Sequence, residues 1–205
     1  KKSAFIDEEL IAIGVSEDYT PYTPTSLKED IETKFFLIWD YNTEEKLVKS
    51  FYTYFEDLIE RHRRGEIRFV VVVGFGILRF DIPFLIQKGA EYKIAPISEL
   101  SKLWYDTYTI DLFQVALPLN DMMFKGLKLE ILAKKARSLG LDIPQGYGSG
   151  GEIAEWYDKR EYERIKRHLE TDLKIIRAID LHHKEVFQAC NKLISSVSYT
   201  HLTLP

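Results

Sequence analysis

The stretch that most constrains the fold runs from residue 70 to residue 85 and has the sequence VVVVGFGILRFDIPFL. It begins with four consecutive valines, Val70 to Val73, and this run is too apolar for a strand with one face in water. It therefore predicts a strand buried on both faces, as in a parallel sheet. Gly74 and Gly76 end the strand. A loop at the carboxyl end of such a strand is where α/β folds usually place their chemistry.

One acid, Asp81, lies among large apolar side chains just after this strand. An acid in such surroundings is costly unless it is paired or holds a metal ion. The simpler interpretation is that Asp81 caps a helix beginning at Ile82 and Pro83, because aspartate is a good N-cap and proline suits the first helical turn. The local sequence alone leaves both interpretations open.

The composition of the 205 residues, with 45% hydrophobic and 29% charged side chains, is that of one soluble domain with a sizeable core. The net charge of -4 excludes a globally basic surface for nucleic acid, so local basic patches would have to provide one. The single cysteine, Cys190, excludes an intramolecular disulfide and fits a reducing, cytoplasmic location. Because no apolar run is long enough to span a bilayer, we expect no membrane partner.

Further strands are predicted at residues 10–15, 35–39 and 108–113, the last with Asp111 near an edge or paired. Asn42 and Glu45 predict a capping box at the start of a helix that ends near residue 65. The basic residues 61–64 end this helix, and they either contact phosphate or, as is more common, form a solvated helix end.

Later helices are predicted at residues 82–89, at 127–139 and from residue 160 onward. The glycine-rich segment 145–151 is predicted to be a flexible loop. It is not a phosphate-binding loop, because it lacks the Gly-Lys-Ser/Thr ending that a nucleotide phosphate needs.

His168 and Asp172 lie one turn apart on the last predicted helix, so their side chains share a face. Asp81 and Asp172 come from distant segments, and carboxylates brought together in this way commonly hold a pair of Mg²⁺ or Mn²⁺ ions. Such a site needs about four carboxylates, so further acids must come from elsewhere.

These segments resemble the DEDD 3′–5′ exonucleases of the ribonuclease H-like fold, and in particular the exonuclease domain of family B DNA polymerases. The second motif of that family is a valine-rich strand followed by Gly-x-Asn-x-x-x-Phe-Asp and an apolar helix, which residues 70–85 match. The third motif is Tyr-x-x-x-Asp on a late helix, which residues 168–172 match in part. Residues 109–112 and 150–153 also look like the family.

The resemblance implies an α/β domain over residues 1–194, with a mixed sheet flanked by helices. It implies a two-metal exonuclease that uses Mg²⁺ or Mn²⁺ and acts on the 3′ end of single-stranded DNA. Asp81 and Asp172 would then be metal ligands, and Gly74, Gly76 and Phe80 would contact the substrate.

Two residues depart from the family pattern. Gly76 stands where the family usually has asparagine, which would weaken a contact to the nucleic acid strand. His168 stands where this branch has tyrosine. Histidine can position or deprotonate an attacking water, so His168 is a candidate catalytic residue, although a structural histidine is nearly as common.

The first family motif, a buried strand ending in Asp-x-Glu, should precede residues 10–15 and is not found there. The segment 30–33 spells it but does not follow an apolar strand, and residues 7–9 are predicted to form a turn. We therefore expect the fold to lack its first, central strand, which would leave two neighbouring strands with unpaired edges. The chain should then bind metal poorly and cleave little. Residues 195–205 resemble a read-through of sequencing adaptor and are predicted to be a non-native tail.

Two alternatives to a DNA exonuclease stay open. One is an RNA-trimming enzyme on the same scaffold, since contact with the 2′-hydroxyl group distinguishes RNA from DNA and the sequence does not show it. The other is a nuclease-like module that has lost catalysis and binds nucleic acid or protein. A polymerase or another replication or repair protein is a candidate partner in either case.

Overall fold

A computed structural model describes residues 8–18, 31, 33–186 and 188 of the chain. Its four described strands form two separate pairs rather than one mixed sheet. β1 (Ala12–Ser16) pairs antiparallel with β2 (Thr33–Leu37), and β3 (Val71–Gly74) pairs parallel with β4 (Tyr108–Asp111). The α/β class is confirmed. Within the described residues, β1 and β3 each have one edge that no other strand covers.

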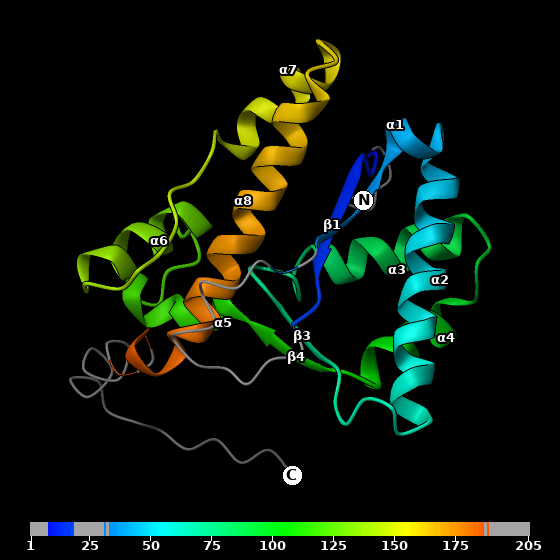
Figure 1. The fold of residues 1–205 in the computed structure, drawn as a ribbon, viewed down its shortest axis with the longest axis horizontal. Coiled ribbons are helices and arrows are strands. Elements are labelled where there is room, and N and C mark those ends of the chain that lie inside the picture. The colour runs from blue at the N-terminus through cyan, green and yellow to red at the C-terminus, as the bar shows by residue number, and fades with distance from the viewer. Residues whose placement is uncertain (1–7, 19–30, 32, 187, 189–205) are drawn as a thin grey trace.

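The strands lie between two groups of helices (Figure 1). The first group is α1 (Ile38–Tyr41), α2 (Glu44–Arg63), α3 (Asp81–Glu91) and α4 (Ile97–Tyr105). Their apolar side chains surround a core that contains Leu47, Tyr52, Ile59 and Leu100, each fully buried. Burial of large side chains of this kind contributes about 1.5–3 kcal/mol per residue to folding.

The second group is α5 (Leu112–Ala116), α6 (Leu129–Ser138), α7 (Ile153–Asp158) and α8 (Tyr162–Leu181), with the short 3₁₀ helices η2 (Leu117–Asn120) and η3 (Gly150–Glu152). Its core contains Leu132, Ile175 and Ile179. The long helix α8 packs against β1, β3, α6 and α7. It is therefore the element that connects both strand pairs.

Burial of the valine strand on both faces was predicted, and this is wrong. Val70 is buried, but Val71 is 48% exposed and Val72 and Val73 are half-buried. The physical reason is that β3 belongs, among the described residues, to a sheet of two strands, and so small a sheet leaves part of its faces open to solvent.

The predicted capping box of Asn42 and Glu45 is also wrong. α2 begins one residue later, with Thr43 as its N-cap, and the Thr43 hydroxyl accepts a hydrogen bond from the Lys46 amide at 3.3 Å. Asn42 instead ends α1 in the left-handed conformation, at φ 63°. Asparagine tolerates that conformation better than most residues, so it serves the turn and leaves the cap to threonine.

The sequence placed most of the other elements within a few residues. The strand predicted at 108–113 stops at Asp111, because Leu112 and Phe113 begin α5. The strand predicted at 35–39 stops at Leu37, because Ile38 begins α1, and the helices α1, α4 and α5 and the 3₁₀ helix η2 were not predicted. In the look-alike segments 7–9 and 30–33, the acids Asp7, Asp30 and Glu32 lie outside the described residues, as does the tail 195–205, whereas Thr33 begins β2. None of the described helices is both long enough and apolar enough to cross a lipid bilayer.

Candidate functional site

The loop between β3 and α3 is held in place by a buried carboxylate on the neighbouring strand. Asp111 is 4% exposed. Its Oδ1 accepts hydrogen bonds from the amides of Gly76 at 2.7 Å and Phe113 at 3.0 Å, and its Oδ2 accepts one from Leu78 at 3.2 Å. Hydrogen bonds from amides to a charged acceptor are stronger than neutral ones. Asp111, predicted to lie near an edge or to be paired, therefore holds this loop in place.

Glycine is favoured at positions 74 and 76 of this loop for two different structural reasons. Gly74 is buried at the end of β3, and a Cβ atom there would lie 2.3 Å from the Ile77 side chain. Gly76 has open space around it but a φ of 78°, which disfavours residues with a Cβ. The two glycines let the chain turn sharply enough to bring the Gly76 amide to Asp111.

Asp81 is the first residue of α3, and Phe80 is its N-cap, without a side-chain hydrogen bond. The interpretation of Asp81 as the N-cap of a helix beginning at Ile82 is therefore wrong. The residue is exposed on one side, but the protein atoms around its carboxyl group desolvate it and raise its pKa above the ordinary value. The nearby Asp111 carboxylate raises the pKa of Asp81 further.

Phe80, a predicted substrate contact, is 49% exposed, and its ring lies against Phe84 at 5.6 Å. Beside it, Arg79 lies over the rings of Phe113 and Phe124, at 5.4 and 4.8 Å from their centroids. Sequence analysis missed Arg79 as a functional candidate. In the sequence, Arg79 is distinguished only as a lone basic residue in the otherwise apolar stretch before Asp81.

The second part of the candidate site is the His168–Asp172 pair on α8. His168 Nε2 lies 3.5 Å from Asp172 Oδ2. His168 Nδ1 lies 2.5 Å from the Tyr147 carbonyl oxygen, and a carbonyl only accepts, so Nδ1 carries a proton and donates it. The glycine-rich segment 145–151 thus supplies a backbone acceptor that orients the imidazole ring, and Trp156 contacts the ring edge-on.

The proton on Nδ1 determines how His168 and Asp172 interact electrostatically. With a proton on Nδ1, a neutral His168 would point the Nε2 lone pair toward the Asp172 carboxylate, which is unfavourable unless one of the two groups gains a proton. Desolvation raises the pKa of Asp172, and a charged His168 opposes this effect.

Of the predicted catalytic residues, the structure brings His168 and Asp172 together, whereas Asp81 lies near Asp111, which was not predicted as a site residue. In the described part of the chain, no group of three or more His, Cys, Asp or Glu side chains is close enough to hold a metal ion. Asp81 and Asp172 both have raised pKa values, so each is a desolvated acid that a bound cation would stabilise. Their chemistry fits Mg²⁺ or Mn²⁺, which prefer oxygen ligands.

The basic residues 61–64 are engaged with acids. Arg63 bonds to Glu60 and Asp106, and Arg64 bonds to Glu66. This arrangement favours the solvated helix end over a phosphate contact.

Comparison of the chain with models of protein families, with curated proteins and with solved structures found no significant match.

Proposed function

We propose that this chain is the core of a metal-dependent 3′–5′ exonuclease that hydrolyses phosphodiester bonds of DNA. The observation that supports this most is the braced loop after β3. A parallel strand ends in a glycine turn held by a buried acid, and a second acid, Asp81, opens the next helix with a raised pKa. An acid with a desolvated carboxyl group at the carboxyl end of a parallel strand is typical of a functional site rather than of a structural cap.

The uncovered edges of β1 and β3 support the proposed ribonuclease H-like sheet. Both strands pack against the same helix, α8, which also carries Asp172. In the proposed fold, one further strand joins the two pairs into one sheet. In this proposal that strand carries the Asp-x-Glu motif, which would supply the remaining carboxylates, and it would cover the exposed Val71 of β3.

In this proposal Asp81 and Asp172 hold the metal ions together with the acids of the further strand. When bound, such ions would supply a nucleophilic water at neutral pH and would stabilise the leaving oxygen. Tyr147 fixes His168 in one orientation, with Nε2 directed toward Asp172. From there Nε2 can accept a proton from a water that lies beside Asp172, which makes His168 the general base.

The exposed side chains before α3 would contact the single-stranded 3′ end. Phe80 and Phe124 offer ring faces on which bases can stack, and Arg79 adds a positive charge beside them. These contacts do not distinguish DNA from RNA, so an RNA substrate is a second outcome that the assay below tests.

The test uses single-stranded DNA and RNA labelled at the 5′ end, so that a shortening ladder reports 3′–5′ polarity. The 205-residue chain is compared with the same chain extended by the residues encoded upstream of Lys1, each with Mg²⁺ or Mn²⁺. We expect the extended protein to degrade DNA. Asp81→Asn or Asp172→Asn should slow it by about 100-fold or more, and His168→Ala by about 100-fold. Asp142→Asn, an exposed acid away from the site, is the matched control.

The outcomes separate the parts of the proposal. If the 205-residue chain itself degrades DNA and Asp81→Ala abolishes this, the exonuclease stands and the further strand is not required. If the extended protein binds no paired metal ions and leaves both nucleic acids intact, the exonuclease proposal is wrong.

A nuclease-like binding module is the second candidate function. The observation that favours it is the enclosure of His168, whose side chain is 11% exposed and whose two ring nitrogens face Tyr147 and Asp172. A histidine held in this way suits a structural role. Binding of single-stranded DNA without metal dependence, and unchanged in Asp81→Asn, would support this alternative.

A further inference from the structure

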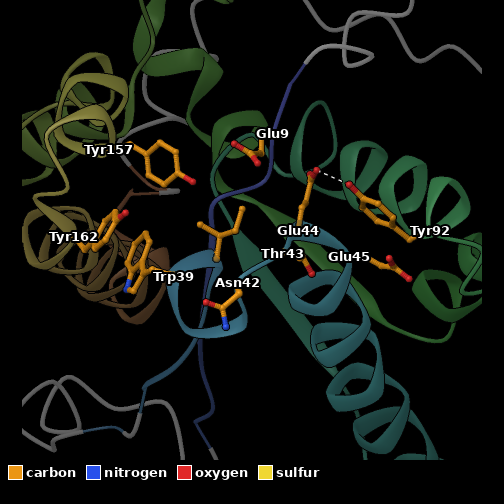
Figure 2. A pocket seen from close by; sticks show the side chains of 10 residues that line it. Glu9, Trp39, Asn42, Thr43, Glu44, Glu45, Tyr92, Tyr157 and Tyr162 are labelled. Carbon is orange, nitrogen blue, oxygen red and sulfur yellow. Dashed lines mark hydrogen bonds between the residues drawn. The ribbon is translucent and has the colours of Figure 1, made fainter.

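A cavity of about 580 Å³ lies between α1, the start of α2, α7 and α8, away from the loop after β3 (Figure 2). One wall is aromatic. Trp39 stacks on Tyr162 with their ring centroids 4.5 Å apart and their planes 8° from parallel, and Tyr157 lies 6.0 Å from Tyr162. Tyr92 and Glu44 form the opposite wall, and Glu9 lies above the space between the two walls. A volume of this size is in the range of small-molecule sites.

The carboxylates of the cavity differ in how far they are neutralised. Glu44 is 10% exposed and accepts hydrogen bonds from Lys88, from the Leu10 amide and from the Tyr92 hydroxyl, the last at 2.6 Å. Glu45 forms an exposed ion pair with Lys49. Glu9, in contrast, has no basic partner among the residues that the structure describes. One negative charge therefore faces the cavity without a described counter-charge.

The negative charge also affects the pKa values of two tyrosine hydroxyl groups in the cavity wall. Glu9 raises the pKa of both Tyr92 and Tyr157, so its carboxylate lies near a hydroxyl on each side of the cavity. Burial is the larger cause in both cases, and Glu44 and Glu91 add to it at Tyr92. A negative field in a space lined by tyrosine and tryptophan rings repels phosphate and attracts cations.

We propose that this cavity binds an organic cation, an ammonium or guanidinium group the size of a lysine or arginine side chain. The cation would lie against the faces of the aromatic wall, where the ring quadrupoles attract it, and would pair with Glu9. Asn42 and Thr43, at the mouth, offer polar atoms for the remaining N–H groups. The cation can come from a free amine or from a basic side chain of a polypeptide, because both present the same group.

The experiment titrates the 205-residue chain with arginine amide, with spermidine and with the tripeptide acetyl-Gly-Arg-Gly-amide, by calorimetry and by tryptophan fluorescence. We expect saturable binding that weakens as salt is added. Glu9→Gln should weaken it about fivefold, as expected for loss of one partly exposed charge partner. Glu8→Gln makes the same chemical change at the adjacent exposed residue, which does not line the cavity, and should leave binding unchanged.

A second variant, Trp39→Leu, tests the aromatic wall, and its circular dichroism and thermal melt show whether it folds. If the folded Trp39→Leu and Glu9→Gln proteins bind as the unchanged chain does, the proposal is wrong. It is also wrong if none of the three probes gives saturable binding. Tighter binding of the tripeptide identifies a polypeptide side chain as the ligand, and tighter binding of spermidine identifies a free amine.

Discussion

At the scale of single residues, Asp111 shows how one side chain determines a loop. Three backbone amides donate to its carboxylate, and all three belong to the segments that flank the end of the parallel pair. A buried amide that loses its acceptor costs about 1–3 kcal/mol.

We predict that Asp111→Ala lowers the free energy of unfolding by about 2–4 kcal/mol, because it leaves these amides without their acceptor. Urea denaturation followed by circular dichroism measures the loss. Asp142→Ala, at an exposed aspartate, should stay within about 0.5 kcal/mol of the unchanged chain. An equal effect of the two variants would contradict the bracing role.

Gly76 provides a second test at this scale, because its φ of 78° is left-handed while the space around it is open. Gly76→Asn should be tolerated, since asparagine adopts this conformation at low cost. Gly76→Val should lose about 1–2 kcal/mol of stability, since a β-branched residue is strained there. Thermal melts of both variants check whether the asparagine variant is the more stable of the two. A valine variant as stable as the asparagine variant would show that the loop adopts another conformation.

Asp81 is expected to destabilise the folded chain at neutral pH. Its folded pKa is raised, chiefly by desolvation, above the value near 3.8 of an unperturbed aspartate. In the window between these two pKa values the folded state binds more protons, so stability falls as the pH rises through that window. Asp81→Asn should therefore raise stability at pH 7 and have little effect below about pH 3.5. Denaturation at both pH values measures this, and a destabilised variant at pH 7 would refute it.

At the scale of elements, α8 lies so close to β1 that only glycine fits at one strand position. A Cβ atom on Gly14 would lie 2.9 Å from the side chains of both Leu169 and Leu173. The apolar stripe of α8 therefore packs on bare backbone. Such contact fixes the helix, and with it the His168–Asp172 pair, relative to the strands.

Gly14→Ala should lose about 1–3 kcal/mol, because the added methyl group overpacks this contact. Gly146→Ala is the matched control, since its Cβ would meet only Ile175 at 3.9 Å, an ordinary contact. Chemical denaturation of the two variants gives the comparison. If Gly14→Ala is neutral, the helix is free to move away from the strand.

The sequence predicted the positions of helices and strands better than it predicted which elements pack against one another. Apolar period and turn residues located the four strands and most helices, since those signals are local. The burial of the valine strand was wrong, because it depends on what lies beside β3, and no local pattern reports that. Asp81 and Asp172 were proposed from their positions in the sequence and from the motif resemblance, whereas the contacts of the Tyr147 carbonyl and of Asp111 needed the tertiary fold.

At the scale of the whole molecule, each of the two described strand pairs has two edges that no other described strand covers. Edge strands with exposed apolar residues favour association between copies of a chain, and natural proteins often place lysine there to prevent it. Val71, at 48% exposed, lies on such a strand.

We predict that Val71→Lys reduces self-association of the 205-residue chain without unfolding it. Light scattering against concentration should show the decrease. Ile131→Lys makes a similar change on the exposed face of α6, where no strand edge is present, and should reduce association less. Equal effects would assign the association to surface hydrophobicity in general.

The stacked rings of Trp39 and Tyr162 have a consequence for the order of folding. One ring belongs to α1 and the other to the first turn of α8, so the contact closes a loop that contains most of the domain. Closing so long a loop has a large entropic cost before the contact is formed, and contacts of this kind slow folding. The helices of the first group can therefore assemble early, while the aromatic wall is completed only when the last long helix docks.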